Sequence, residues 1–314
     1  MFEVVFLGTS ASAPSVARNL TATMVLYRHY RFLIDCGEGT QRQLLKSGLG
    51  FKRLKRILLT HGHLDHILGL GGLVSTFSRW EAVETLEVYG GRWALERVRD
   101  LILGVVLRGA KPALKLKFIE LSPGVVLEDE DFVLTAFSVT HRGPDCFGFT
   151  FQERSKRPFL AEEAERLRVP AGPERKRLVQ GEPITLADGT TVYPDQVLGE
   201  PRPGTKLVYV GDASRVGDLI TEAQGADALV IEATYLSADA ELAEQFAHLT
   251  AAQAATLARE AEVKTLYINH ISRRYRGQEI LQEAQSMFPN TVVAKDLDRF
   301  QIRAAMPSRS ACLA

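Results

Sequence analysis

Short apolar runs with the length of β-strands alternate with helical patterns along most of the 314-residue chain. In the first half such runs end in Gly, Asp or Thr, and they cover residues 2–7, 24–27, 32–34 and 57–59. Helical patterns occupy 40–45, 68–80 and 92–103, and strand patterns resume at 86–89, 114–121, 132–139 and 146–152. Strands interleaved with helices predict sheets that are covered by helices.

The same alternation returns in the last third of the chain. It predicts strands at 206–210, 228–231, 265–268 and 291–293, and helices at 251–261 and 278–287. Residues 153–203 interrupt the pattern, because they are rich in proline and charged side chains and have few apolar runs. We predict an inserted arm there, with a disordered surface loop as the alternative. The predicted division is a compact domain of 1–152 and 204–303, the arm 153–203, and a flexible tail at 304–314.

Composition narrows the class of protein. Lys and Arg together number 38, as do Asp and Glu, so the net charge is zero. This balance excludes a polybasic nucleic-acid coat protein and an acidic disordered chain, but it allows a local binding patch. Three cysteines at unrelated positions exclude a disulfide framework and a cysteine zinc cluster. The sequence shows no membrane-spanning run and no signal peptide, and we expect a cytoplasmic protein without membrane contact.

Candidate chemistry is concentrated in one run, Leu-Leu-Thr-His-Gly-His-Leu-Asp-His-Ile, at residues 58–67. Directly after an apolar strand it supplies His61, His63, Asp65 and His66, whose side chains are the ligands of divalent cations such as zinc. In an extended chain the alternation would direct 61, 63 and 65 to one side, so that His66 would suit a second ion. The alternative is a polar helix start whose histidines bind backbone groups, which accounts poorly for four such residues so close together.

Three further candidates each follow an apolar strand. His141, Asp212 and His270 stand just past the ends of the strands predicted near 132–139, 206–210 and 265–268, where sheets of this kind place their functional sites. The alternative is that each of them merely caps the next helix. His29 lies between two strands and is expected in a hairpin. His248 precedes a helix and has no strand before it, so we predict an acid rather than a ligand, with a surface histidine as the alternative.

These residues, taken in order, resemble the metallo-β-lactamase superfamily and, more narrowly, the ribonuclease Z family of tRNA 3′-processing endonucleases. The resemblance covers nearly the whole chain, through residues 6–14, 18–19, 35–41, 146–149, 211–212, 232–234, 269–275 and 288–290. Three departures from the family pattern, the order of Gly62 and Leu64, Ala213, and Asn269, leave every ligand in place. The resemblance implies a four-layer α/β fold (α+β), an αββα sandwich with an inserted protruding arm.

The resemblance also implies a ligand set and partners. Two zinc ions would be held, one by His61, His63 and His141 and the other by Asp65, His66 and His270, with Asp212 between them. The ligand chemistry would also accept Mn²⁺ or Fe²⁺. The arm would grip the substrate, a precursor tRNA, through Gly172, Pro173, Arg175, Lys176 and Arg177. The family is typically homodimeric, with the arm of one subunit serving the site of the other.

The expected reaction is phosphodiester hydrolysis by a hydroxide formed between the two cations. Asp65 would orient this hydroxide, and His248 would protonate the departing ribose 3′ oxygen. Glu232 would orient His248, and Arg274, from the motif that follows His270, would support the site from behind the ligands. The products would be a tRNA with a 3′-hydroxyl and a trailer with a 5′-phosphate.

Two other functions fit part of the sequence. A hydrolase of a small phosphodiester, sulfate ester or thioester could use the same cations, but the arm has no evident use in such an enzyme. A metal-binding or RNA-binding scaffold without catalysis would need a missing ligand, and the sequence lacks none.

Overall fold

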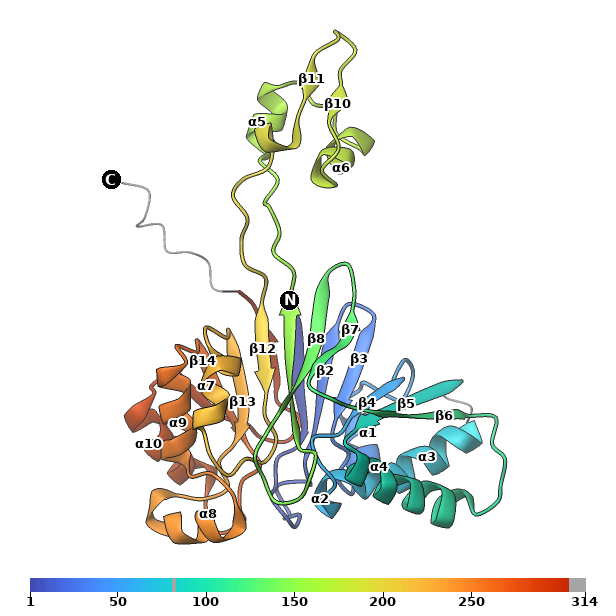
Figure 1. The fold of residues 1–314 in the computed structure, drawn as a ribbon, viewed down its shortest axis with the longest axis vertical. Helices are drawn as coiled ribbons and strands as arrows, with labels where there is room; N and C mark the ends of the chain where they lie inside the picture. Colours follow the sequence, from blue (N-terminus) through green and yellow to red (C-terminus); the bar gives the residue numbers. More distant parts are fainter. Residues whose placement is uncertain (81–82, 305–314) are drawn as a thin grey trace. The chain divides into compact units, whose positions relative to one another are not determined.

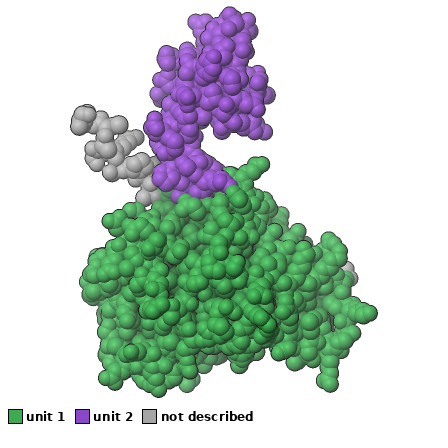
Figure 2. Space-filling view, in the orientation of Figure 1, with its two compact units in different colours: residues 1–152, 205–314 green, residues 153–204 purple. Residues whose placement is uncertain are grey.

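The computed structural model describes residues 1–80 and 83–304, which form two compact units. One unit contains Met1–Gln152 and the chain from Thr205 onward, and the other contains Glu153–Gly204 (Figure 2). The predicted tail at 304–314 lies, from residue 305 on, outside the described residues.

The first sheet of the larger unit has seven strands in the order β16-β1-β2-β3-β4-β5-β6. Its antiparallel part comprises β16 (Arg299–Ile302), β1 (Phe2–Gly8), β2 (Ala22–Tyr27) and β3 (Tyr30–Ile34). Parallel pairing then continues from β3 through β4 (Arg56–Leu58), β5 (Thr85–Gly90) and β6 (Lys115–Glu120).

The second sheet also has seven strands, in the order β15-β14-β13-β12-β9-β8-β7. Parallel pairing joins β12 (Lys206–Tyr209), β13 (Ala228–Glu232), β14 (Thr265–Asn269) and β15 (Thr291–Val293). The remaining strands are β9 (Phe147–Glu153), which pairs antiparallel with β12, β8 (Phe132–Ser138) and β7 (Gly124–Glu128).

Helices cover the outer face of each sheet (Figure 1). The first sheet carries α1 (Thr40–Lys46), α3 (Gly69–Trp80), α4 (Arg92–Arg99) and the π-helix Asp100–Leu107. The second carries α7 (Ile220–Ala223), α9 (Ala251–Glu260) and α10 (Gly277–Met287), and α8 (Ala240–Phe246) precedes α9. Among the described residues, no helix combines the length and the apolar character needed to cross a membrane.

Strand geometry explains why this arrangement has three apolar layers. Because successive side chains point to opposite faces, Phe32 and Ile34 enter the core between the sheets, whereas Leu33 packs under the helices. In β13 the same alternation sends Val230 inward and Leu229 outward. Strands buried on both faces read as continuous apolar runs, which is why the sequence identifies them. The predicted αββα sandwich is confirmed.

The predicted elements differ from the structure in a few places. The helix expected at 92–103 is two elements, since α4 ends at Arg99 and a π-helix continues to Leu107. Strands β7 and β16 were not predicted: their residues are mostly exposed or half-buried, so they lack a continuous apolar run. The short helix α2 (Leu64–Ile67) was also not predicted, and it changes the geometry of the metal-ligand run.

The smaller unit, the arm, has a core of its own. Its elements are α5 (Ala161–Arg166), α6 (Pro173–Val179), β10 (Ile184–Thr185), β11 (Thr191–Val192) and the 3₁₀-helix Pro194–Gln196. The buried residues that hold them together are Ala164, Val169, Leu178, Ile184, Val192, Val197 and Leu198. A segment with this core is folded, so the alternative of a disordered loop does not describe it.

Candidate metal centre

Strands from both sheets end at the site. His61 follows β4 of the first sheet, and in the second sheet His141, Asp212 and His270 follow β8, β12 and β14. The parallel strands β12, β13 and β14 bring their carboxyl ends to one edge, which places the polar residues after them side by side. The prediction from strand ends therefore located residues that the structure brings together.

The extended alternation predicted for residues 61, 63 and 65 is wrong after His63. This residue is the N-cap of α2, with φ −69° and ψ 152°, and the chain turns into a helix at Leu64. Asp65 therefore lies in a helical turn with His66 and does not continue the line of His61 and His63. The structure groups Asp65 with His66 and His270.

One group of potential ligands consists of His61, His63, His141 and Asp212, whose ligand atoms all lie within 4.8 Å of one another. The His61 Nε2 and His63 Nδ1 atoms are 2.8 Å apart. Asp212 Oδ2 lies 3.7 Å from His61 Nε2 and 3.6 Å from His141 Nε2. Three imidazoles and a carboxylate around one point form a donor set suited to zinc.

The second group contains Asp65, His66 and His270, and Asp212 adjoins it. Asp212 Oδ1 lies 3.3 Å from His270 Nε2, and Asp212 Oδ2 lies 3.4 Å from His66 Nε2. Three of these atoms, His66 Nε2, Asp212 Oδ1 and His270 Nε2, are buried without a hydrogen-bond partner. Buried polar atoms are rarely left unsatisfied. A cation between them would satisfy all three, so the residues present fit a metal.

Hydrogen bonds behind the ligands fix which nitrogen of each ring faces the centre. The carboxylate of Asp35 is fully buried and accepts from Thr60 N, Thr60 Oγ1 and His66 Nδ1, each at 2.8 Å. His66 is thereby held with Nε2 toward Asp212, the arrangement that a ligating histidine needs. Sequence reasoning missed this role of Asp35, although the residue stands directly after β3 in the Asp-Cys-Gly-Glu-Gly-Thr motif.

His141 and His270 are oriented in the same way. His141 Nδ1 donates to the Ala247 carbonyl at 2.8 Å, and His270 Nδ1 lies 3.0 Å from Thr234 Oγ1. His270 has φ 51°, a left-handed conformation that costs a residue with a side chain about 1–3 kcal/mol and that is concentrated at functional sites. The surrounding contacts hold His270 in this conformation and keep its Nε2 toward the cluster.

The electrostatics favour the ligand forms of these side chains. Burial, aided by the charge of His66, lowers the pKa of His61 well below its usual value, and burial lowers the pKa of His63 to about 4. Burial alone would raise the pKa of Asp65, but His66 and His270 outweigh it and hold this pKa below the usual range. At neutral pH His61 and His63 are therefore neutral and Asp65 is ionised, the forms that bind a metal. Burial alone would lower the pKa of His66, but Asp212, Asp65 and Asp35 outweigh it and hold this pKa well above its usual value, so a cation bound there would replace the proton of His66.

His248 lies beside the ligands, with its Nδ1 3.9 Å from Asp212 Oδ2. The same nitrogen donates to Glu232 Oε1 at 2.9 Å, and Glu232 is fully buried and also accepts from the Ala213 amide. Burial lowers the pKa of His248, but the charge and hydrogen bond of Glu232 outweigh it, and the pKa is raised to about 9. Arg274 is exposed in the turn after His270, and its charge acts on Tyr235 and Tyr275. Its supporting role behind the ligands stays a prediction.

The basic residues predicted for substrate binding lie in the arm, on α6. Gly172 precedes the helix with φ 128°, a conformation that favours glycine, and Pro173 is its first residue. Arg175 donates to the Val169 carbonyl and stacks on the Phe159 ring, so it stabilises the arm itself. Of the other two basic residues of α6, Arg177 forms an ion pair with Glu182 and Lys176 is exposed.

Comparison with known proteins gives the family. A ribonuclease Z of Bradyrhizobium sp. (strain ORS 278) is 48% identical over 302 residues, which are 96% of this chain and 100% of that protein. A ribonuclease Z of Listeria innocua is 40% identical over 309 residues, covering 96% and 99% of the two chains. The family profile described as Anti-Pycsar protein Apyc1 matches residues 2–156.

Solved structures agree with these relatives. Human tRNase Z, short form, superposes with a TM-score of 0.68 at 26% identity and covers 96% of this chain and 99% of its own. The metallo-β-lactamase fold protein YhfI from Bacillus subtilis shares the fold, with a TM-score of 0.67 at 18% identity over 95% of this chain and 98% of its own. By fold and by sequence over 96% of its length, this chain belongs to the ribonuclease Z family.

Proposed function

We propose that this protein is a zinc-dependent endoribonuclease that removes the 3′ trailer from precursor tRNA. The observation that carries the proposal is the buried cluster in which His66 Nε2, Asp212 Oδ1 and His270 Nε2 converge without hydrogen-bond partners. The membership in the ribonuclease Z family supplies the substrate class.

Two cations would be held by the two groups of ligands, His61, His63 and His141 in one and Asp65, His66 and His270 in the other, with Asp212 shared. Both oxygens of Asp212 face histidine nitrogens, Oδ1 toward His270 and Oδ2 toward His61, which suits a shared carboxylate. When bound, divalent cations lower the pKa of water and offset the charge of a phosphodiester. A neutral protein can therefore attract RNA at this site without a basic surface overall.

His248 is suited to protonate the departing ribose 3′ oxygen. With Nδ1 bound to Glu232 at 2.9 Å, its other ring nitrogen is free to donate a proton to substrate. Because the pKa of His248 is raised to about 9, the ring carries that proton at neutral pH. Asp65, whose Oδ2 also accepts from the Ser12 amide at 2.9 Å, is suited to orient the attacking water.

The arm would bind tRNA away from the bond that is cut, through Lys176 and Arg177 on α6. We further propose the homodimer that is typical of the family, with the arm of one subunit serving its partner. The two described cysteines, Cys36 and Cys146, are free and buried, which suits the reducing cytoplasm as the place of action.

A second candidate is hydrolysis of a small phosphodiester at the same cluster. The Apyc1 profile matches residues 2–156 and therefore ends where the arm begins. A profile without the arm favours a reaction that does not need the arm. The two candidates differ in whether the arm is needed for the reaction.

End-mapping of the products from a precursor tRNA tests the proposal. Purified protein should yield a tRNA with a 3′-hydroxyl and a trailer with a 5′-phosphate, and chelation or His63→Ala should abolish both. Hydrolysis of bis-p-nitrophenyl phosphate measured in parallel reports on the cluster alone. A protein that cleaves this small diester but leaves precursor tRNA intact would refute the proposal and support the second candidate.

A further inference from the structure

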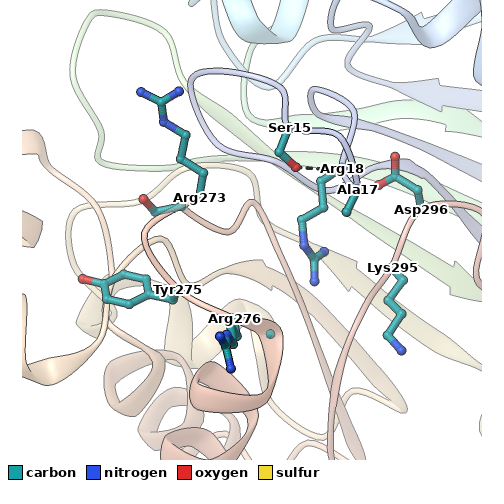
Figure 3. A pocket seen from close by; sticks show the side chains of 10 residues that line it. Ser15, Ala17, Arg18, Arg273, Tyr275, Arg276, Lys295 and Asp296 are labelled. Atoms are coloured by element: carbon teal, nitrogen blue, oxygen red, sulfur yellow. Dashed lines mark hydrogen bonds between the residues drawn. The ribbon is translucent and has the colours of Figure 1, made fainter.

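An open cavity of about 520 Å³ is lined by residues other than those assigned to the metal centre (Figure 3). Its lining includes four cationic side chains, Arg18, Arg273, Arg276 and Lys295, and we call it the basic groove. A second cavity, of about 540 Å³, shares Arg18, Gly277 and Lys295 with it and continues the groove along the start of α10 toward β15.

The cationic ends in the groove are largely available to a ligand. Arg273, Arg276 and Lys295 are exposed, and no carboxylate within residues 1–80 and 83–304 forms an ion pair with them. The lining has two carboxylates, both of which act on the charge of Arg18. Asp296 accepts from Asn19 N at 2.7 Å, and also from Gln43 and Thr9, and Asp298 accepts from Lys295 N at 2.9 Å. The groove therefore has an excess of positive charge that the described part of the protein does not neutralise.

The walls of the groove are tied together by internal bonds. Arg18, which is partly buried, donates through Nη1 to Thr9 Oγ1 at 2.6 Å and to the Ala294 carbonyl at 2.7 Å. Its Nη2 lies against Gly277, so close that a Cβ added to this glycine would be 3.0 Å from it. The 9–11 segment and Ile271 also exchange backbone bonds, so the groove is preformed.

Two connections place the groove next to one half of the metal centre. The 11–19 loop, which supplies Arg18 to the groove, also donates the Ser12 amide to Asp65 Oδ2 at 2.9 Å. The turn that supplies Arg273 begins directly after His270. The groove and the half of the centre that contains Asp65 and His270 are therefore built from the same two segments of chain.

We propose that the basic groove binds the backbone phosphates of the unpaired 3′ trailer as it leaves the metal centre; this inference rests on the proposed function. Cations without protein partners are the groups that contact nucleic-acid phosphates. The tRNA side of the cleaved bond must present its ribose oxygen to His248, which leaves the groove beside Asp65 for the trailer side.

Precursor tRNAs that differ only in trailer length test the proposal. The wild type and Arg273→Gln/Arg276→Gln are assayed with trailers of one and of about eight nucleotides, a length typical of single-strand sites. Loss of two phosphate contacts is expected to raise KM about tenfold for the long trailer and less than about twofold for the short one, with kcat unchanged, and to reduce the salt slope by about 1.4. Arg79→Gln/Arg259→Gln removes the same charge from exposed sites on α3 and α9 and serves as the matched control.

Failure of this inference is distinguishable from failure of the proposed function. Wild-type cleavage of precursor tRNA reports on the function, and hydrolysis of bis-p-nitrophenyl phosphate by the double variant shows that its metal centre is intact. Equilibrium binding of a single-stranded RNA of about eight nucleotides needs no catalysis, and the groove variant should bind it about tenfold more weakly than the control. Equal effects on both trailer lengths, or unchanged binding of this RNA, would overturn the inference.

Discussion

Replacing Asp35 by asparagine is expected to weaken cation binding at the half of the centre that contains His66. Asp35 Oδ2 accepts from His66 Nδ1 and Thr60 Oγ1, both at 2.8 Å, and the residue is fully buried. In Asp35→Asn the side-chain amide oxygen is expected to keep accepting from Thr60 N. The amide nitrogen then stands where Asp35 Oδ2 stood, facing His66 Nδ1. His66 Nδ1 would then have to give up its proton and accept, which moves the proton to Nε2, the atom that faces the cations. A protonated Nε2 cannot act as a ligand.

The expected loss of cation affinity follows from this change of hydrogen-bond partner at His66 Nδ1. Losing a hydrogen bond to a buried charged group costs about 1.5–3 kcal/mol, and loss of an outer partner of a ligating histidine weakens metal binding about 10–100-fold. The two figures agree, since a factor of ten corresponds to about 1.4 kcal/mol. Titration of the metal-free protein with Zn²⁺ against a chromophoric chelator, fitted with two sites, measures the change. The site that contains His66 should weaken by this factor. The site of His61, His63 and His141 should weaken less, because Asp35 reaches His61 only through Thr60 Oγ1, which lies 3.0 Å from His61 Nδ1.

The control is Asp131→Asn, which removes the same charge from the carboxylate that pairs with Arg28 far from the centre in sequence and fold. Thermal melts of both metal-free variants establish that they are folded. If Asp35→Asn bound both cations as the wild type does, the orienting role assigned to Asp35 would be wrong. Equal weakening of both sites would instead indicate a general loss of structure around the cluster.

Three further outcomes are expected. His248→Ala should keep its full metal content but lose about 10²–10⁴-fold in single-turnover cleavage, and full activity would exclude its role as the acid. Lys176→Ala/Arg177→Ala should raise KM for precursor tRNA and reduce the salt slope by about 1–2, with hydrolysis of bis-p-nitrophenyl phosphate unchanged; equal loss on both substrates would refute a substrate role for the arm. In the metal-free protein, the pKa of His248 is raised from 6.5 to about 9. The protonated ring therefore adds about 2–4 kcal/mol to the free energy of unfolding below pH 6.5, and this stabilisation is lost as pH rises through 9. Urea unfolding across this range should show the loss in the wild type and not in Glu232→Gln.

Much of the fold and most of the candidate ligands could be predicted from the sequence for one physical reason. Strands covered on both faces must be apolar at nearly every position, so β1, β13 and β14 are visible as runs and their ends are visible too. Polar residues at those ends, such as Asp212 and His270, then stand out as candidates. The structure brings them together as the strand order requires.

The features that sequence could not give depend on contacts between distant segments or on very short elements. A helix of four residues such as α2 has no periodic pattern, so the turn at His63 was not visible. The bond between Asp35 and His66 joins residues 31 positions apart, and no local signal specifies it. The bond from the Arg175 guanidinium to the Val169 carbonyl was likewise not visible in the sequence, and the substrate role that the family resemblance implies for Arg175 stays a prediction.

The place where the arm joins the sheet has a consequence for how such enzymes can change. Gln152 in β9 and Lys206 in β12 are opposite each other in an antiparallel pair, so Glu153–Gly204 stands where a hairpin turn would otherwise be. The entropy of closing a loop grows only slowly with its length, and this appendage brings its own core. Evolution or engineering could therefore graft a different appendage onto the same stem, or trim it to a tight turn, and redirect an unchanged hydrolytic apparatus to another class of phosphodiester.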